Sequence, residues 1–110
     1  MITVTELLER TEFAQLNKIP MPDREITCVY CCDLLSVAMG KAPADSAWVT
    51  VMGNVNAVAV SALADTACVI VADGAGVDER ALAKADEQGV ILIGSAMPVF
   101  ETAKIVDGLL

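Results

Sequence analysis

The sequence ACVIVADGAG, residues 67–76, contains the strand signal that decides the expected fold. Its first six residues are apolar, and the Asp-Gly-Ala-Gly that follows is typical of a turn. A short apolar run that ends in turn residues is typical of a strand buried on both faces, as in a parallel sheet. The runs at residues 48–52 and 90–93 have the same character. We therefore expect three buried parallel strands.

Helix signals separate these strands and follow the last one. Helices are expected at residues 55–64, 79–88 and about 97–109. Asp78 and Gly89 suit the two ends of the second helix, and Ser95 and Pro98 suit the start of the third. Strands that alternate with helices predict right-handed crossovers. We expect a single α/β domain over residues 1–110, a compact three-layer domain with a mostly parallel sheet flanked by helices.

The N-terminal part of the chain carries further signals. Thr3 and Glu6 have the spacing of a capping box, so a short helix is expected to begin there. Beyond it we expect an extended piece at residues 13–16, a loop at Pro20 and Pro22, a strand at residues 25–32, and a helix at residues 33–39 that Gly40 ends.

Composition limits the class of protein. Of the 110 residues, 55% are hydrophobic, which is enough for a core, and the net charge is -8. The Lys and Arg residues are few and scattered, so nucleic-acid phosphates are not expected partners. The N-terminus lacks the basic start and apolar core of a secretion signal, and no apolar run is long enough for a membrane span. We predict a soluble cytoplasmic protein whose cysteines are thiols.

The cysteines cluster in DREITCVYCCDLLS, residues 23–36. Strand alternation puts Ile26, Cys28, Tyr30 and Cys32 on one face and Thr27, Val29 and Cys31 on the other. Cys28 and Cys31 would then point apart, which is unsuited to binding one metal ion, and the chain has no histidine. We interpret the cysteines, Cys68 included, as small apolar core residues and expect no cofactor or metal. The alternative is a thiol redox or metal-binding protein that uses Cys28, Cys31 and Cys32.

The turns after the expected strands are candidate ligand sites, because ligands of open parallel sheets bind beyond the carboxyl ends of the strands. The candidate residues there are Asn54, Asn56, Asp73, Gly74, Gly94 and Ser95. Helix N-termini at this edge favour an anion, such as a nucleotide. Helix capping is the competing interpretation of Asn54 and Asn56. Arg24 is added as a candidate phosphate contact, with the alternative that Asp23 and Arg24 hold their loop by hydrogen bonds.

Catalytic patterns are missing from the sequence. There is no histidine to act as a general base, no serine in a nucleophile elbow, and no partner for Asp45, Asp65 or Asp73. The Asp73 turn has neither the spacing nor the lysine of a P-loop. We expect that the chain is not an enzyme.

The order of these segments resembles the DRTGG domain family over nearly the whole chain. The matching segments are residues 23–27 (DREIT), 33–36 (DLLS), 48–51 (WVTV), 54–60 (NVNAVAV), 67–72 (ACVIVA) and 89–92 (GVIL). Cys28 and Val29 stand where the family motif has its two glycines. Because glycine permits unusual backbone angles, their replacement indicates a more regular strand at this point.

The resemblance implies a fold like the N-terminal domain of HPr kinase/phosphorylase and of the muramyl-peptide ligases, without the P-loop domain of the kinase. Related domains accompany CBS domains in regulated pyrophosphatases and act as regulatory or dimer-forming modules. We therefore expect a non-catalytic regulatory or assembly module that forms a homodimer. The expected partners are a second copy, an unidentified protein and an anionic small molecule that the module senses.

Overall fold

The computed structural model of the protein describes residues 1–20 and 24–110; Pro22 and Asp23, which the sequence places in a loop, lie outside these ranges. The strands are β1 (Ile2–Thr3), β2 (Ala14–Gln15), β3 (Glu25–Ile26), β4 (Cys28–Cys31), β5 (Ser46–Thr50), β6 (Cys68–Val71) and β7 (Leu92–Gly94). The helices are α1 (Val4–Leu8), α2 (Leu35–Lys41), α3 (Val55–Ala64), α4 (Glu79–Gln88) and α5 (Val99–Gly108).

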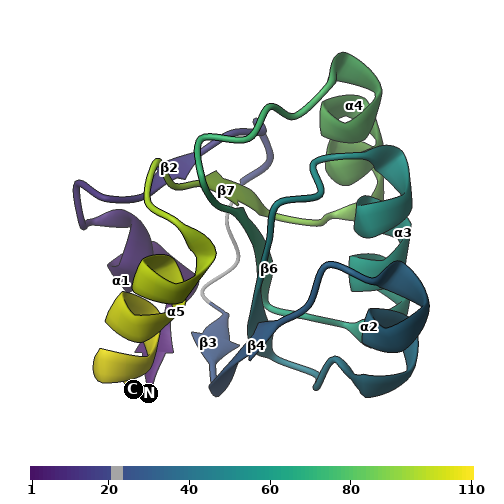
Figure 1. Ribbon diagram of the computed structural model, residues 1–110. Helices are drawn as coiled ribbons and strands as arrows, with labels where there is room; N and C mark the ends of the chain where they lie inside the picture. Colours follow the sequence, from purple (N-terminus) through teal and green to yellow (C-terminus); the bar gives the residue numbers. More distant parts are fainter. Residues whose placement is uncertain (21–23) are drawn as a thin grey trace.

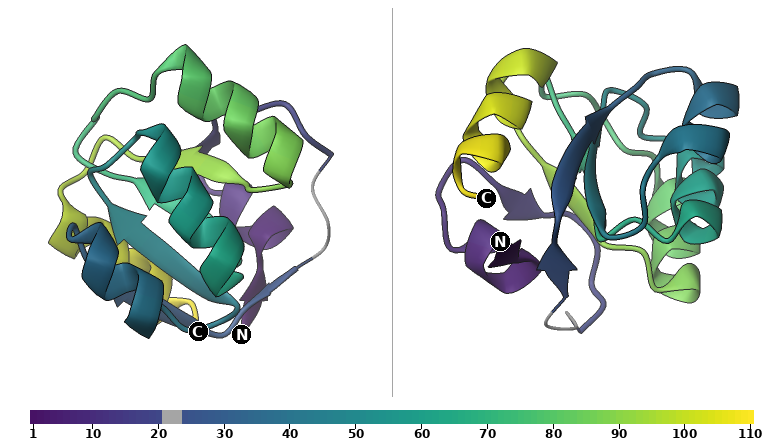
Figure 2. Two further views of the ribbon diagram at one scale, coloured as in Figure 1. Left: turned by 90° about the vertical axis from the view of Figure 1, so that its right-hand side faces the viewer. Right: turned by 90° about the horizontal axis from the view of Figure 1, so that it is seen from below.

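Three layers make up the fold, with a five-stranded sheet in the middle (Figure 1). The strand order is β2-β7-β6-β5-β4; the last four strands are parallel, and β2 pairs antiparallel with β7. Helices α2, α3 and α4 cover one face, whereas α1 and α5 lie on the other (Figure 2). A small antiparallel pair, β1 with β3, lies beside the main sheet. This arrangement confirms the predicted fold class.

Alternating side chains of the strands build a core on each side of the sheet. On β5, Trp48 packs with the core under α2, α3 and α4, while Ala47 and Val49 pack with the core under α1 and α5. The indole N–H of the fully buried Trp48 donates to the Cys32 carbonyl at 2.9 Å. Small buried residues such as Ala57 bring α3 close to the sheet, which suits a chain with few aromatic residues.

Several predicted helix ends are confirmed. Both hydrogen bonds of the capping box between Thr3 and Glu6 are present at the start of α1. The bounds of α3 and α4 agree with the predicted ranges. Asp78 caps α4 by accepting from the Ala81 N–H, and Gly89 ends it with a positive φ of 70°. Local capping chemistry was sufficient to place these ends.

The predicted strand at residues 25–32 is wrong in one respect, because it is broken at Thr27. The N–H and hydroxyl of Thr27 both donate to the Asp45 carbonyl, at 3.0 and 3.4 Å, while β3 pairs with β1. The break changes the alternation of faces. Ile26 packs with the core under α1 and α5, and Tyr30 packs with the opposite core.

Three predicted helix boundaries are wrong. Helix α2 starts at Leu35, because hydrogen bonds to β5 and to the loop after β5 hold Asp33 outside the helix. The helix also includes Gly40, which was expected to end it. Helix α5 starts at Val99 with Pro98 at the N-cap position, and no side chain caps it. Ser95 instead shares a hydrogen bond with Thr102 in the first turns of that helix.

Within the described ranges, no helix has the length and apolar character needed to cross a membrane.

Candidate functional site

The carboxyl ends of the parallel strands meet at one edge of the sheet, which we call the carboxyl edge. It is formed by the loops after β4, β5, β6 and β7, residues 32–34, 51–54, 72–78 and 95–98. Six of the predicted site residues lie at this edge or beside it: Asn54, Asn56, Asp73, Gly74, Gly94 and Ser95. Arg24 precedes β3 and does not join them.

Asn54 and Asn56 differ in what their side chains do. The Asn54 carboxamide oxygen accepts from the Ala57 N–H at 2.9 Å, so it caps α3 as the competing interpretation held. Asn56 is exposed in the first turn of the same helix. The N–H groups of Val55 and Asn56 have no partner within the helix and point out of its N-terminus. This helix end is therefore the part of the predicted site that has donors to offer.

The Asp73–Gly74 turn is tied to the loop after β7. The N–H groups of Asp73 and Gly74 donate to the carbonyls of Met97 and Ser95, at 2.7 and 2.9 Å. Both residues have a φ of 62°, in the left-handed region that favours glycine. These amides are already bonded within the protein and would have to break those bonds to bind a phosphate.

Gly94 and Ser95 are likewise already in contact with other parts of the protein. A Cβ atom at Gly94 would lie 3.1 Å from a methyl group of Leu16, so the glycine allows β2 and its following loop to approach β7. Ser95 is buried, and its hydroxyl lies 2.9 Å from that of Thr102 and accepts from the Met97 N–H at 3.2 Å. Gly94 therefore serves the packing of β2 against β7, and Ser95 joins the start of α5 to the sheet.

Asp33 and Thr50 form a polar link at the carboxyl edge that the sequence analysis missed. The Asp33 carboxylate accepts from the Thr50 hydroxyl at 2.7 Å and from the Val51 N–H at 3.0 Å. Thr50 is fully buried at the end of β5. The signal in the sequence is an acidic residue directly after one strand and a hydroxyl residue at the end of its neighbour.

The loops at the carboxyl edge are tightly packed and acidic. A Cβ atom at Gly53 would lie 2.5 Å from the Gly76 carbonyl oxygen, so glycine is required where these two loops meet. The four loops contain Asp33, Asp73 and Asp78 but no Lys or Arg. A free anion would therefore meet a negative potential at this edge, which a bound cation would have to offset.

Arg24 lies at the opposite, amino edge of the sheet. Its guanidinium donates to the Asp45 carboxylate from two nitrogens, at 2.9 and 3.1 Å, and lies 3.1 Å from the Asp65 carboxylate. It also donates to the Asp65 carbonyl. Both Asp45 and Asp65 have a φ near 60°; Asp45 directly precedes β5, and Asp65 follows α3 at the start of the loop that leads into β6. Arg24 therefore fastens loops, as its alternative interpretation held, through partners that the sequence did not indicate.

The four cysteines are free thiols in different environments. Cys68 is buried, as a core residue should be, and burial raises the pKa of its thiol to about 12. Cys31 is exposed, so interpreting it as a core residue is wrong. Partial desolvation and then the Asp33 carboxylate raise the pKa of Cys31. A raised pKa lowers the fraction of reactive thiolate, which disfavours the redox alternative at Cys31.

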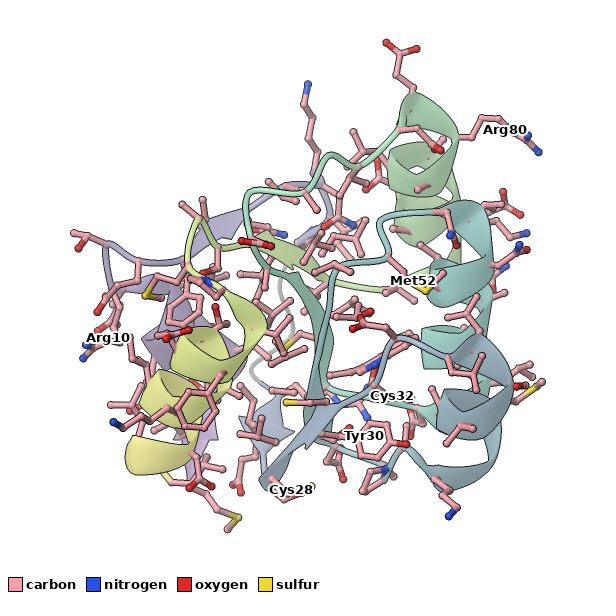
Figure 3. The ribbon with its side chains drawn as sticks, viewed as in Figure 1. Arg10, Cys28, Tyr30, Cys32, Met52 and Arg80 are labelled. Carbon is pink, nitrogen blue, oxygen red and sulfur yellow. The ribbon has the colours of Figure 1, made fainter. Side chains whose placement is uncertain are left out.

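Tyr30, Cys28 and Cys32 lie along β4 and the residue after it (Figure 3). Tyr30 and Cys32 lie on the α2 side of the sheet, where they pack against the same core. Desolvation, and then the Cys32 side chain, raises the pKa of the Tyr30 hydroxyl. Within residues 1–20 and 24–110, no three Cys, Asp or Glu side chains are grouped so that they could hold a metal ion.

Comparisons with known proteins find a similar fold but no similar sequence. No protein family and no curated protein matches the sequence. A similar solved structure contains the CBS and DRTGG domains of the regulatory region of Clostridium perfringens pyrophosphatase, complexed with its activator, diadenosine tetraphosphate. The TM-score is 0.70 at 10% identity, over 94% of this chain and 45% of that chain. The chain thus has the fold of part of a regulatory region and spans less than half the length of that solved chain.

Proposed function

We propose that this chain is a regulatory and assembly module of the DRTGG type, which acts as a homodimer and responds to a nucleotide or similar anionic ligand. The observation that carries the proposal is the fold, shared over 94% of the chain with part of a regulatory region that binds an activator. The sequence resemblance to the DRTGG family, found from the order of short motifs, supports the same assignment. A regulatory role also suits a carboxyl edge whose polar groups largely bond to one another.

The N-terminus of α3 is where we place the ligand. It offers the N–H groups of Val55 and Asn56 and the exposed Asn56 side chain, whereas the amides of Asp73 and Gly74 are occupied. Helix N-termini bind phosphates through such groups. Because the surrounding loops are acidic, we propose that a nucleotide binds with Mg²⁺, which would neutralise part of the phosphate charge.

Thermal unfolding with added nucleotides tests ligand binding. Diadenosine tetraphosphate, ATP, ADP and AMP should each be added at millimolar concentration, with and without Mg²⁺. A ligand at 100 times its dissociation constant adds about 2.7 kcal/mol to the free energy of unfolding. For a domain of this size that raises Tm by roughly 10–20 °C. Asn56→Asp, which puts a negative charge at the helix N-terminus, should reduce the shift, while Arg80→Ala on the exposed side of α4 should not.

Two results would contradict the proposal separately. If none of the nucleotides shifts Tm, with or without Mg²⁺, the ligand-sensing part of the proposal is wrong. Light scattering should be measured at protein concentrations up to 100 times a dissociation constant of about 1 μM. If the protein is a monomer at these concentrations, the homodimer part of the proposal is wrong. If Asn56→Asp left a nucleotide-induced shift unchanged, the ligand would bind elsewhere than at α3.

A further inference from the structure

The two edges of the main sheet are protected differently. At one edge, β2 pairs antiparallel with β7 and so covers it. At the other edge, β4 pairs with β5 on one side, and no described strand pairs with its other side. Figure 1 shows β4 at the front of the molecule, between α5 and α2. The sheet therefore has an open edge along Cys28–Cys31.

The sequence of β4 lacks the usual protection of an open edge. Proteins block such edges with charged side chains, proline or a bulge, because unpaired backbone groups otherwise bind another strand. The β4 sequence, CVYC, has neither charge nor proline, and its register with β5 is regular at all four residues. Such an open edge offers unpaired backbone groups to which another strand can bind.

Hydrogen bonds around β5 show which β4 residues face outward. The Ala72 N–H donates to the Thr50 carbonyl, so Thr50 faces β6, and the Cys32 N–H donates to the Val49 carbonyl, so Val49 faces β4. Backbone groups of successive residues point to opposite sides of a strand. Residues 28, 30 and 32 therefore bond toward β5, while Val29 and Cys31 direct their N–H and C=O groups to the open side.

Apolar surface accompanies this open edge in both helix layers. Along α5, Phe100, Ala103, Lys104 and Asp107 recur at helical spacing and line, with Val29, a groove of about 320 Å³. Phe100 is 71% exposed in this groove. In the other layer, α2 packs against α3 and exposes Val37, and Leu34 just before it is 61% exposed. These side chains place apolar surface on both sides of the open edge, where a protein partner could cover it.

We propose that a second copy of this chain pairs with β4 in antiparallel orientation, about a two-fold axis perpendicular to the sheet at Tyr30, so that the two sheets become one. This inference rests on the homodimer of the proposed function and identifies its surface. The axis at Tyr30 puts Val29 opposite Cys31 of the other copy, and these are the residues with outward groups. The pairing makes four backbone hydrogen bonds, whereas an axis at Val29 or Cys31 makes fewer within β4.

A second copy fits this surface better than an unrelated strand does. A perpendicular two-fold axis keeps the α5 side of one copy next to the α5 side of the other, so the two Phe100 grooves meet. It also makes the two α5 helices antiparallel, which brings Lys104 of one copy toward Asp107 of the other, a complementary pair of charges. With these charges paired, the two-fold axis passes between residues 104 and 107, so Lys104 and Asp107 lie nearer the axis and Phe100 lies further from it along α5.

Cysteine cross-linking tests the pairing and its register. In a Cys28→Ser/Cys32→Ser background, Val29→Cys would stand opposite the native Cys31 of the other copy. Directly opposite residues of a hydrogen-bonded pair have Cα atoms about 5.5 Å apart, which a disulfide spans. Mild oxidation should therefore give a covalent dimer in denaturing gels without reductant. The same background without Val29→Cys, or with Val29→Cys and Cys31→Ser, should not cross-link, since the remaining thiols would lie beyond disulfide reach.

An interface variant tests the same surface without cysteine chemistry. Phe100→Glu should raise the dimer dissociation constant at least about tenfold in analytical ultracentrifugation, because it puts a charge into the apolar part of the groove that the other copy covers. Leu63→Glu is the matched control on α3, where Leu63 is 74% exposed, and should leave it within about twofold. A wild-type monomer would overturn both the homodimer and this interface. A dimer that neither cross-links between residues 29 and 31 nor responds to Phe100→Glu would overturn this interface alone.

Discussion

Asn17 should be one of the most costly side chains to remove, because it holds the covered edge of the sheet. The side chain is 6% exposed and bonds twice to the backbone around β7. Its amide nitrogen donates to the Val90 carbonyl at 2.7 Å, and its carboxamide oxygen accepts from the Leu92 N–H at 2.9 Å. Asn17→Ala would leave these two backbone groups buried without partners.

The expected loss follows from those two groups. A buried polar group left unsatisfied costs about 1–3 kcal/mol, so two cost about 2–6 kcal/mol. Water can reach part of a sheet edge, so we expect the lower half of this range, about 2–4 kcal/mol. A loss of 2 kcal/mol lowers Tm by roughly 8–16 °C in a domain of this size. Urea unfolding of Asn17→Ala against the wild type measures the difference directly.

Two further variants make the test of Asn17 specific. Asn56→Ala removes an exposed carboxamide and should change the free energy of unfolding by less than about 0.5 kcal/mol. Asn17→Asp keeps the acceptor for the Leu92 N–H but places an oxygen against the Val90 carbonyl, so it should be at least as destabilising as Asn17→Ala. If Asn17→Ala behaved like Asn56→Ala, the two hydrogen bonds would not stabilise the sheet edge and the reasoning would fail.

Three further predictions concern packing, loop fastening and the thiols. Gly53→Ala should destabilise the protein by about 1–3 kcal/mol, because its methyl group would lie 2.5 Å from a carbonyl oxygen; calorimetry measures this, and an unchanged Tm would contradict it. Arg24→Ala should lower the free energy of unfolding in urea by about 1–2 kcal/mol, a value kept small because the partners of Arg24 are exposed to solvent. Adding Asp45→Ala to Arg24→Ala should lower it little further, because the two side chains contribute through the same contact. A thiol reagent near pH 8 should modify the buried Cys68 only on unfolding. Folding raises the pKa of Cys68 from 9.0 to about 12, so the thiol ionises at a lower pH in the unfolded chain than in the folded protein. The free energy of unfolding should therefore fall as pH rises through that range, and Cys68→Ala should lack this part of the fall.

The fold class followed from local patterns. Short apolar runs alternated with capped helices, and that alternation is enough to specify parallel strands with helical crossovers. The caps at Thr3, Asn54 and Asp78 were readable because each side chain bonds to a backbone group three residues away. The break at Thr27 was not readable, because its cause is the Asp45 carbonyl, 18 residues further along the chain.

The candidate site was predicted less well than the fold. The order of the strands correctly gathered Asn54, Asn56, Asp73, Gly74, Gly94 and Ser95 near one edge. The sequence did not reveal that the Asp73 and Gly74 amides bond to the neighbouring loop. It also grouped Arg24 with this edge, although Arg24 lies at the opposite one with Asp45 and Asp65. The Asp33–Thr50 link went unnoticed for the same reason, since Asp33 lies in the loop after β4 and Thr50 ends the neighbouring strand β5.

The sequence by itself determined the order of strands and helices, the capped helix ends and the acidic character of the protein, because each depends on neighbours along the chain or on composition alone. Only the tertiary structure decided which donors stay free for a ligand, which cysteine is exposed and which sheet edge is left open. Those properties depend on contacts between segments far apart in the sequence, such as the loops after β6 and β7 or the pairing of β2 with β7. The periodicity of one segment carries no information about which distant segment will pair with it.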